Sequence, residues 1–419
     1  MRSMAASRVR YRVLGLTFFT AFIMYMDRVC MGTATPTIMK EFGLSKIQMG
    51  WSTSAFNWAY ALFQVPGGWM ADRYGARAVL AGAMIWWSVF TAVTGAAAGG
   101  LSLALARFFF GMGEAAAFPG ASRSLVRWLP AAQRGFGQGF QHAGSRLGFA
   151  VTPLLVVFLI GRMSWRWVFY GFGAVGIVWA AIWYIYYRNY PQDHRGVNRQ
   201  ELDLLAASGF AAKPPAAAAV PWSRILASRD LWFLSSMYFC YGWVLWMYIQ
   251  WLPTYLQEAR HLSLAKMGLA ASVPGLAATL TNVLGGWISD HLARRWSDLR
   301  RGRLFVSMVG FTIAGAGMIP GVLADDFATG LLCLTLALAG LELTVAVSWA
   351  ICLDIGGDFS GSVSAVMNTL GNIGGALSAV AIPYLATHLG WNWAFLTASV
   401  MCLVAAVLAT RIDPRSSAV

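Results

Sequence analysis

Charged side chains are scarce in this sequence. Asp, Glu, Lys and Arg make up 11% of the 419 residues, whereas an average soluble protein contains about 25%. Hydrophobic residues account for 58% of the chain. So few charges cannot cover a soluble globule of this size. The composition therefore excludes an ordinary soluble enzyme and predicts an all-α membrane protein, because helices satisfy their own backbone hydrogen bonds in lipid.

Clusters of catalytic or metal-binding residues are also lacking. The five cysteines lie in apolar runs and form neither a CxxC pattern nor a disulfide framework. The five histidines are scattered, and none has a cysteine or carboxylate at ligand spacing. We therefore expect no catalytic residues, no metal and no cofactor. A membrane-embedded enzyme is the weaker alternative, as is a solute sensor, which would normally carry a soluble output domain.

What the sequence does contain is a series of long apolar runs. An α-helix needs about 20 apolar residues to cross a bilayer. Twelve runs have suitable lengths, at 11–37, 47–71, 78–98, 100–123, 135–161, 166–188, 230–256, 266–289, 304–323, 327–353, 361–387 and 391–411.

The longest polar interruption falls between the sixth and the seventh run. It is rich in charged residues and contains Lys-Pro-Pro-Ala-Ala-Ala-Ala-Val-Pro at 213–221. This segment predicts a cytoplasmic linker at 190–229. The linker would separate an amino-terminal six-helix bundle, 1–189, from a carboxy-terminal six-helix bundle, 230–419.

The basic residues predict the orientation of the chain. The net charge of +14 would suggest nucleic-acid binding in a soluble protein. Here 22 of the 31 Lys and Arg residues fall in the two tails and every second loop, six fall in the remaining loops and three lie within the runs. Basic loops stay in the cytoplasm. We therefore expect both termini to be cytoplasmic, with no nucleic-acid partner.

The two halves of the chain repeat each other. The sequence Gly-Gly-Trp-Met-Ala-Asp-Arg at 67–73 is echoed by Gly-Gly-Trp-Ile-Ser-Asp-His at 285–291, and Trp-Arg-Trp-Val-Phe at 165–169 by Trp-Asn-Trp-Ala-Phe at 391–395. Both pairs occupy matching places after matching spans. They predict two bundles related by pseudo-two-fold symmetry about the membrane normal, and such proteins bind substrates near the midplane between the repeats.

Six charged residues lie well inside the predicted spans, away from their ends. A charge near the bilayer centre costs at least about 2.5–3.5 kcal/mol, so such residues usually face a polar cavity and have a partner or a function. A structural salt bridge between helices is the alternative interpretation. The six residues are Asp27, Arg28, Arg107, Glu114, Arg146 and Glu342.

Several motifs resemble those of a known transporter family. The segment Gly67 to Arg77 resembles the loop between helices 2 and 3 of the major facilitator superfamily. The anion:cation symporters of this superfamily are suggested by Asp27-Arg28, by Arg107 with Glu114 and Pro119, by Trp128-Leu-Pro130, by Trp251-Leu-Pro253 and by Asn368-x-x-Gly-Asn372. That family includes bacterial hexuronate, galactonate, glucarate, tartrate and phthalate carriers.

The resemblance implies proton-coupled uptake of an organic carboxylate by alternating access. It also implies a multi-pass protein of the bacterial inner membrane, and we expect a monomer. Anion exchange and sodium coupling are the alternatives within the transporter class.

Axial depth along the helices assigns roles to the charged residues. At 1.5 Å per residue, Asp27, Arg28 and Arg107 reach one level of the bilayer. This places Asp27 beside Arg107, leaves Arg28 for the substrate carboxylate and leaves Glu114 isolated near the midplane. Burial away from water favours the protonated form of a carboxyl group. Our candidates for proton coupling are therefore Glu114, modulated by Asp27, and Glu342.

The substrate site is expected to combine guanidinium, aromatic and amide groups. A guanidinium binds a carboxylate through two hydrogen bonds. His142 and Arg146 lie one turn apart, and Asn368 and Asn372 repeat this spacing in the other half. Tyr60 reaches similar depth, with packing as its alternative role. The candidate substrate-binding residues are Arg28, Tyr60, Arg107, Gln141, Arg146, Tyr241, Asn368 and Asn372.

A further set of residues is expected to control conformation. Its glycines allow close helix packing, and its charges lie at the cytoplasmic surface, where they can bridge the bundles and hold the inner gate shut. They should affect rate and not substrate choice. The set consists of Gly67, Asp72, Arg73, Gly75, Arg77 and Asp290.

The charge count leaves two alternatives for the substrate. If Arg28 and Arg146 both face the cavity without a counter-charge, a dicarboxylate would satisfy both, and this is the interpretation we favour from the sequence. If Glu342 neutralises Arg146, only one anion site is left. An unpaired buried charge costs several kcal/mol, so the pairing decides the number of anionic groups.

Overall fold

The computed structural model describes residues 6–130, 133–206, 220–356 and 359–416, except for the side chains of Asp72, Arg134 and Gly135. These residues form helices and connecting turns, with no strand among them. A short 3-10 helix lies at Pro191–Asp193. The helices are α1 (Val9–Phe42), α2 (Lys46–Tyr74), α3 (Ala76–Gly95), α4 (Gly100–Glu114), α5 (Ala117–Trp128), α6 (Arg134–Ile160), α7 (Trp165–Tyr186), α8 (Arg199–Ala206), α9 (Trp222–Ala227), α10 (Arg229–Glu258), α11 (Leu264–Arg295), α12 (Leu299–Leu323), α13 (Phe327–Gly356), α14 (Ser360–His388) and α15 (Trp391–Ala409).

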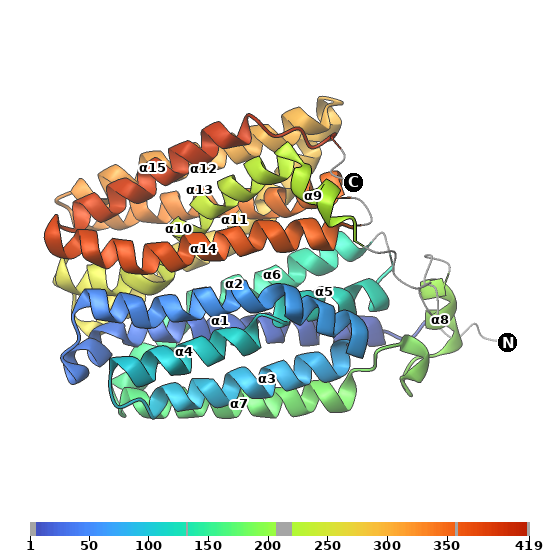
Figure 1. Cartoon of the computed structure of the whole chain (residues 1–419), viewed down its shortest axis with the longest axis horizontal. Helices are drawn as coiled ribbons and strands as arrows, with labels where there is room; N and C mark the ends of the chain where they lie inside the picture. Colours follow the sequence, from blue (N-terminus) through green and yellow to red (C-terminus); the bar gives the residue numbers. More distant parts are fainter. Residues whose placement is uncertain (1–5, 131–132, 207–219, 357–358, 417–419) are drawn as a thin grey trace.

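Within the described chain, ten helical segments are long and apolar enough to cross a membrane. Helices α4 and α5 together make one of them, Gly100–Trp128. Helices α2 and α10 contain 29 and 30 residues and are not among the ten. Both lie parallel to the other long helices in Figure 1. The all-α membrane architecture is thus confirmed, while the count of twelve spans stays a prediction.

Local signals fix the first helical hairpin. Gly43 ends α1 in the left-handed conformation, with φ of 63°, which glycine adopts without strain. Ser45 then begins α2 with a capping box: its side chain accepts the Gln48 amide at 3.2 Å, and the Gln48 side chain accepts the Ser45 amide at 2.9 Å. The chain therefore reverses within three residues.

Proline explains the break between α4 and α5. A proline inside a helix lacks an N–H donor, and its ring clashes with the carbonyl group four residues earlier. Pro119 has that effect on Ala115, and the helix is interrupted there. Glu114 consequently becomes the last residue of α4 and lies beside the break, where it is fully buried.

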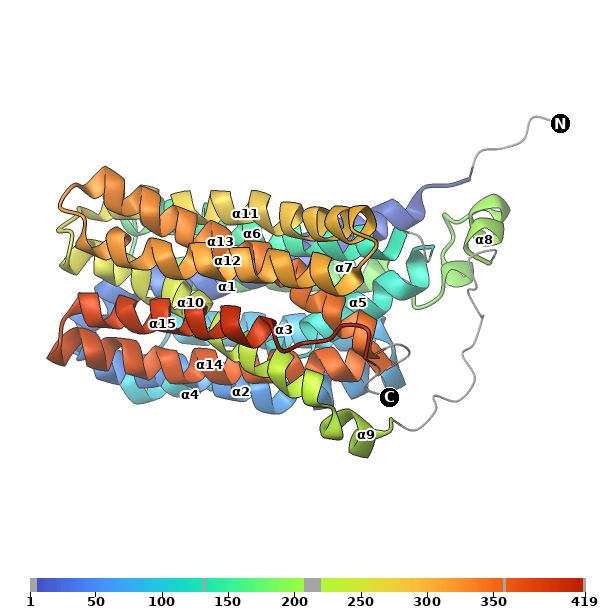
Figure 2. The same ribbon diagram turned by 90° about the horizontal axis from the view of Figure 1, so that it is seen from above.

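The helices form two groups that lie side by side. Helices α1–α7, the amino-terminal half, occupy the lower part of Figure 1, and α10–α15, the carboxy-terminal half, the upper part. Figure 2 shows the same bundle from above. Between the halves, α2 packs on α14, α6 on α11 and α1 on α10. The first turn of α1 and the last turn of α15 lie at one end of the molecule, together with α8 and α9.

The halves make close backbone contact at the opposite end, which we call the outer end because it carries the α1–α2 connection that the basic residues assign to the outside. A Cβ atom on Gly32 would lie 1.9 Å from the carbonyl oxygen of Ile249, and one on Gly50 would lie 2.4 Å from that of Ala379. The Ser54 hydroxyl donates to the Ala376 carbonyl group at 2.7 Å across the same interface. The halves are therefore closed against each other there.

The part of the linker that contains α8 packs on the amino-terminal half. Glu201 of α8 is fully buried and accepts the backbone amides of Val9 and Arg10 at 3.2 and 3.1 Å. Its carboxylate also pairs with the Arg10 guanidinium at 3.0 Å and accepts the Ser7 hydroxyl at 2.5 Å. A carboxylate at the amino terminus of a helix satisfies free N–H groups and the helix dipole. The linker residue Glu201 thus caps the amino terminus of α1, although it lies 191 positions after Arg10 in the sequence.

Topology can be tested by labelling single cysteines. In a cysteine-free background, Asp203→Cys in α8 and Lys266→Cys in α11 both place a thiol at an exposed position. With cytoplasmic termini, a membrane-impermeant maleimide should label Lys266→Cys in intact cells and Asp203→Cys only after the membrane is opened. Labelling of Asp203→Cys in intact cells would contradict the predicted orientation.

Candidate anion-binding site

A pocket lies between the two halves of the molecule. Its walls come from α1, α2, α5 and α6 of one half and from α10, α13 and α14 of the other. The lining residues are Tyr25, Arg28, Tyr60, Phe118, His142, Arg146, Tyr238, Tyr241, Gly242, Leu245, Trp246, Val345, Trp349, Asn368, Gly371 and Asn372.

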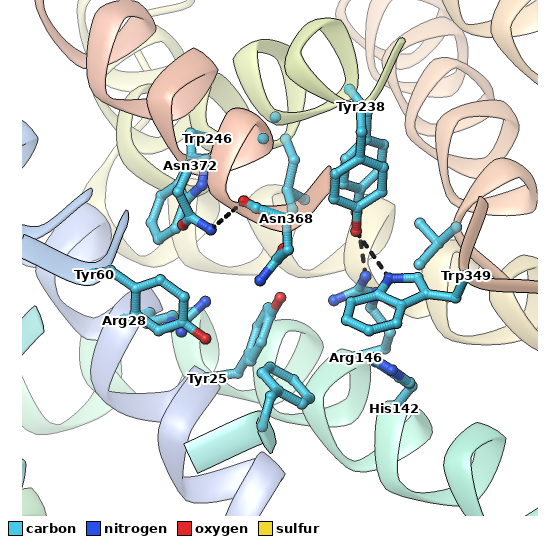
Figure 3. A pocket seen from close by; sticks show the side chains of 16 residues that line it. Tyr25, Arg28, Tyr60, His142, Arg146, Tyr238, Trp246, Trp349, Asn368 and Asn372 are labelled. Carbon is cyan, nitrogen blue, oxygen red and sulfur yellow. Dashed lines mark hydrogen bonds between the residues drawn. The ribbon is translucent and has the colours of Figure 1, made fainter. Parts of the chain in front are cut away.

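Two guanidinium groups face this pocket from either side of one aromatic ring. Figure 3 shows Tyr25 between Arg28 and Arg146. The Tyr25 ring centroid lies 5.1 Å from the Arg28 guanidinium carbon and 5.3 Å from that of Arg146. The Tyr60 ring lies 4.8 Å from Arg28 on another side. Aromatic faces stabilise a cation without neutralising it, so any counter-charge for these two groups must come from an acidic residue or a ligand.

Arg28 forms a buried ion pair with Glu114. The Arg28 Nε atom donates to Glu114 Oε2 at 2.7 Å, and the two side chains are 5% and 0% exposed. This bond leaves the Nη2 atom of Arg28 and the Oε1 atom of Glu114 buried without a hydrogen-bond partner in the described chain. Buried polar groups are normally satisfied, and unsatisfied ones indicate a ligand, a water or a proton.

Arg146 forms a second buried ion pair, with Glu342 of the carboxy-terminal half. Its Nε atom donates to Glu342 Oε2 at 2.6 Å. Tyr241 donates to Glu342 Oε1 at 3.0 Å, and the Asn282 amide donates to Oε2 at 3.0 Å. Arg146 also bonds the Tyr241 hydroxyl at 3.2 Å, while its Nη1 atom has no hydrogen-bond partner among the described residues.

The pairing expected from axial depth is wrong. Glu114 is not isolated, and Arg28 is not left without a counter-charge, because the two form an ion pair. Asp27 and Arg107 form no ion pair within 4.0 Å in the described chain, and neither Asp27 oxygen has a hydrogen-bond partner there. Axial depth fixes the level of a side chain but not its rotation about the helix. Two neighbouring residues such as Asp27 and Arg28 point about 100° apart.

The pocket contains six of the eight candidate substrate-binding residues. Arg107 and Gln141 are buried but are absent from its lining. The Arg107 guanidinium carbon lies 4.1 Å from the Phe110 ring centroid and 5.3 Å from that of Phe56. Arg107 therefore lies against aromatic rings behind the pocket wall, next to the Arg28–Glu114 pair and outside the cavity.

Aromatic residues form a larger part of the wall than the sequence analysis predicted. The Trp349 indole donates to the Tyr238 hydroxyl at 3.1 Å, and the His142 ring stacks on Phe118 with centroids 5.2 Å apart. Tyr25 and Tyr238 were both missed. Each lies three residues before a predicted site residue, Arg28 and Tyr241, so helical spacing could have identified them.

The predicted gating residues contact their own half. Gly75 has a φ of 86° and packs against Asn189, and Arg77 donates to the Tyr184 carbonyl group at 2.9 Å. Asp290 pairs with Arg303 at 2.6 Å, and Arg303 also pairs with Asp354 at 3.0 Å.

The remaining gating residues do not reach the other half either. Gly67 packs against Ala116, and Arg73 lies over Trp69. The Asp72 side chain lies outside the described residues. Among the described gating residues, no ion pair or hydrogen bond joins the two halves in this conformation, so their gating role stays a prediction.

Comparison with known proteins agrees with this arrangement. The family model described as Major Facilitator Superfamily matches residues 17–379. The chain belongs to the major facilitator superfamily. This confirms the resemblance found in the sequence, and with the ten apolar helical segments it makes the chain a multi-pass membrane protein.

The relatives of this superfamily member include carriers of organic anions. The chain is 36% identical over 408 residues to the probable sulfoacetate transporter SauU of Cupriavidus necator, covering 97% of this chain and 94% of the relative. It is 32% identical over 410 residues to the D-galactonate transporter of Escherichia coli, covering 96% and 94%. A solved structure with the same fold is a bacterial homologue of the human lysosomal transporter Spinster, inward-facing and occupied, with a TM-score of 0.74, 19% identity and 98% of both chains covered.

Proposed function

We propose that this chain is a secondary active transporter of the inner membrane that carries an organic anion together with protons by alternating access. The observation that carries the proposal is the Arg28–Glu114 pair. A buried cation and a buried acid form one hydrogen bond at the wall of a pocket between the halves, and each keeps an unsatisfied atom. The named substrates of the relatives, sulfoacetate and D-galactonate, are organic anions, which fits a guanidinium site.

The chemistry of this pair links a proton to a substrate. When Glu114 is ionised, it neutralises Arg28, and an incoming carboxylate would compete with it for the guanidinium group. When Glu114 binds a proton, the ion pair is lost and Arg28 is left as an unpaired buried cation. An unpaired buried charge is costly, so this state favours binding of an anion. The anion and the proton then cross together, and neither is favoured without the other.

The closed outer end supports alternating access. Gly32 and Gly50 allow the two halves to meet there through backbone atoms, whereas the pocket lies deeper, at Arg28 and Arg146. Transport would require this interface to open while contacts form at the opposite end. The predicted gating residues Arg73 and Arg77 lie at that opposite end, where Arg73 is exposed and Arg77 is partly exposed, so both are available for such contacts.

Purified protein in liposomes provides the test. With the membrane potential clamped by valinomycin and potassium, an alkaline interior should drive accumulation of radiolabelled galactonate or sulfoacetate, and a protonophore should abolish it. A sodium gradient alone should drive none. Accumulation that followed the sodium gradient, or exchange that ignored both gradients, would replace proton symport with one of the two alternative coupling modes.

A further inference from the structure

The two arginine–glutamate pairs at the pocket are not equivalent. One donor satisfies the Glu114 carboxylate, and its Oε1 atom has no hydrogen-bond partner in the described chain. Three donors satisfy the Glu342 carboxylate: Arg146 and Asn282 bond Oε2, and Tyr241 bonds Oε1. Glu114 therefore lacks hydrogen bonds that an ionised carboxylate requires, whereas Glu342 has them on both oxygens.

We propose that Glu342 sets the charge selectivity of the pocket: by neutralising Arg146 it restricts the site to substrates with one anionic group. This inference rests on the proposed function, in which an organic anion binds between the halves.

The hydrogen bonds show why Arg146 stays neutralised while Arg28 does not. Protonation of Glu342 would leave Arg146 without a counter-charge, and the Tyr241 hydroxyl, which now donates to Oε1, would have to turn and accept from the acid. Glu114 can take a proton on its unbonded Oε1 atom without any rearrangement of a hydrogen-bond donor. A proton or a competing anion therefore separates Arg28 from Glu114 more readily than it separates Arg146 from Glu342.

A charge count at the pocket gives the number of anionic groups. The charged residues in its wall are Arg28 and Arg146, and their counter-charges are Glu114 and Glu342. Asp27 and Arg107 lie behind the wall and carry opposite charges. With Glu114 protonated, one positive charge is left unmatched. One carboxylate or sulfonate restores neutrality, whereas a second would place an extra negative charge next to Glu342.

The rest of the site suits a neutral, hydroxylated substrate body. Arg146 keeps its Nη1 atom without a hydrogen-bond partner in the described part of the chain, and as half of a neutral pair it can donate to a hydroxyl group. Asn368 and Asn372 face the pocket from α14, and His142 from α6. The expected substrate class is a monoanionic hydroxy acid. The relatives do not decide this point, because galactonate carries one anionic group and sulfoacetate two.

Two pairs of probes isolate the charge of the second group. Galactonate and galactarate differ by a terminal hydroxymethyl group in place of a carboxylate, and so do isethionate and sulfoacetate. These probes are titrated into the purified full chain by calorimetry. For the probe pair that the wild type binds, the dissociation constant of the monoanion should be at least about tenfold lower than that of the matching dianion.

Variants of the Arg146–Glu342 ion pair should change the preference for the monoanion over the dianion in predictable directions. Glu342→Gln leaves Arg146 unpaired and should shift the ratio of dissociation constants towards the dianion by at least about tenfold. The double variant Arg146→Gln with Glu342→Gln removes both charges and should restore the monoanion preference. Glu258→Gln is the matched control, because this exposed glutamate pairs with Lys46 at the outer end, away from the pocket.

Each outcome decides a different claim. Wild type that prefers the dianion, or Glu342→Gln with an unchanged ratio, overturns the role of Glu342 while leaving anion transport in place. Wild type that binds none of the four probes overturns the proposed anion site and this inference with it. If Glu342→Gln fails to elute as a single species in gel filtration, the wild-type ratio and the double variant still decide the question.

Discussion

Glu114→Gln is expected to abolish proton-driven accumulation of substrate while leaving counterflow exchange intact. Glutamine has the shape of the protonated acid and cannot release a proton, so the variant is fixed in the state that binds the anion. It should exchange external for internal substrate, but a pH gradient should no longer drive uptake beyond equilibrium. Uptake by proteoliposomes under an imposed pH gradient, and counterflow without one, measure the two activities separately.

Glu41→Gln is the control for this variant. Glu41 lies near the end of α1, accepts from Trp165 and pairs with Arg166, and its side chain is 42% exposed. Its replacement should leave gradient-driven uptake unchanged. If Glu114→Gln still accumulated substrate against a gradient, the coupling proton would have to move to another acid. Asp27 would be the first choice, because both of its oxygens are buried without a hydrogen-bond partner in the described chain.

The helices could be predicted well because apolar length and local caps determine them. The predicted run at 47–71 lies within α2, which begins where the Ser45 capping box requires. The break in the fourth run was missed, although Pro119 marks it: a hydrophobic run shows that a segment crosses the bilayer but not that it is one continuous helix. Helices α8 and α9 were also missed, because they are short and polar and lie in the linker.

The level of the site could be predicted, but the pairing within it could not. Sequence analysis placed Arg28 and Tyr60 at similar depth and selected Arg146 by its helical spacing, and all three line the pocket. Ion pairing also depends on helix rotation, which the partner helices determine. The end of α4 at Glu114 lets this acid reach Arg28, and no periodicity in the sequence reports that contact.

The Arg146–Glu342 pair was left open in the sequence analysis, and the structure decides it. These two residues come from opposite halves of the chain, 196 positions apart, and they meet only because α6 and α13 face the same cavity. Their pairing removes the assumption that supported a dicarboxylate, namely that Arg146 lacks a counter-charge. The one-anion alternative therefore replaces it as the expected substrate charge.

Gly32→Ala is expected to reduce net uptake by about fivefold to 100-fold, because overpacking a tight contact costs about 1–3 kcal/mol and each 1.4 kcal/mol corresponds to a factor of ten in an equilibrium constant. The added Cβ atom would lie 1.9 Å from the carbonyl oxygen of Ile249 and 3.0 Å from its carbonyl carbon, both backbone atoms of α10 that cannot rotate away. The halves could then no longer meet at the outer end. The variant should accumulate in conformations that are open there, and uptake by proteoliposomes measures the loss.

A thiol at Ser54 reports the conformation directly. Ser54 is buried and bonds Ala376 across the closed interface, so in a cysteine-free background Ser54→Cys should react slowly with an impermeant maleimide when Gly32 is kept and faster when combined with Gly32→Ala. Gly15→Ala is the control, because a Cβ atom on this glycine of the same helix meets no atom within 4 Å. It should leave both uptake and labelling unchanged.

Normal uptake by Gly32→Ala, with unchanged labelling, would contradict this prediction. It would mean that α1 and α10 can separate or slide without preventing closure of the outer end. Gly50 against Ala379 would then be the contact that limits how closely the halves can approach.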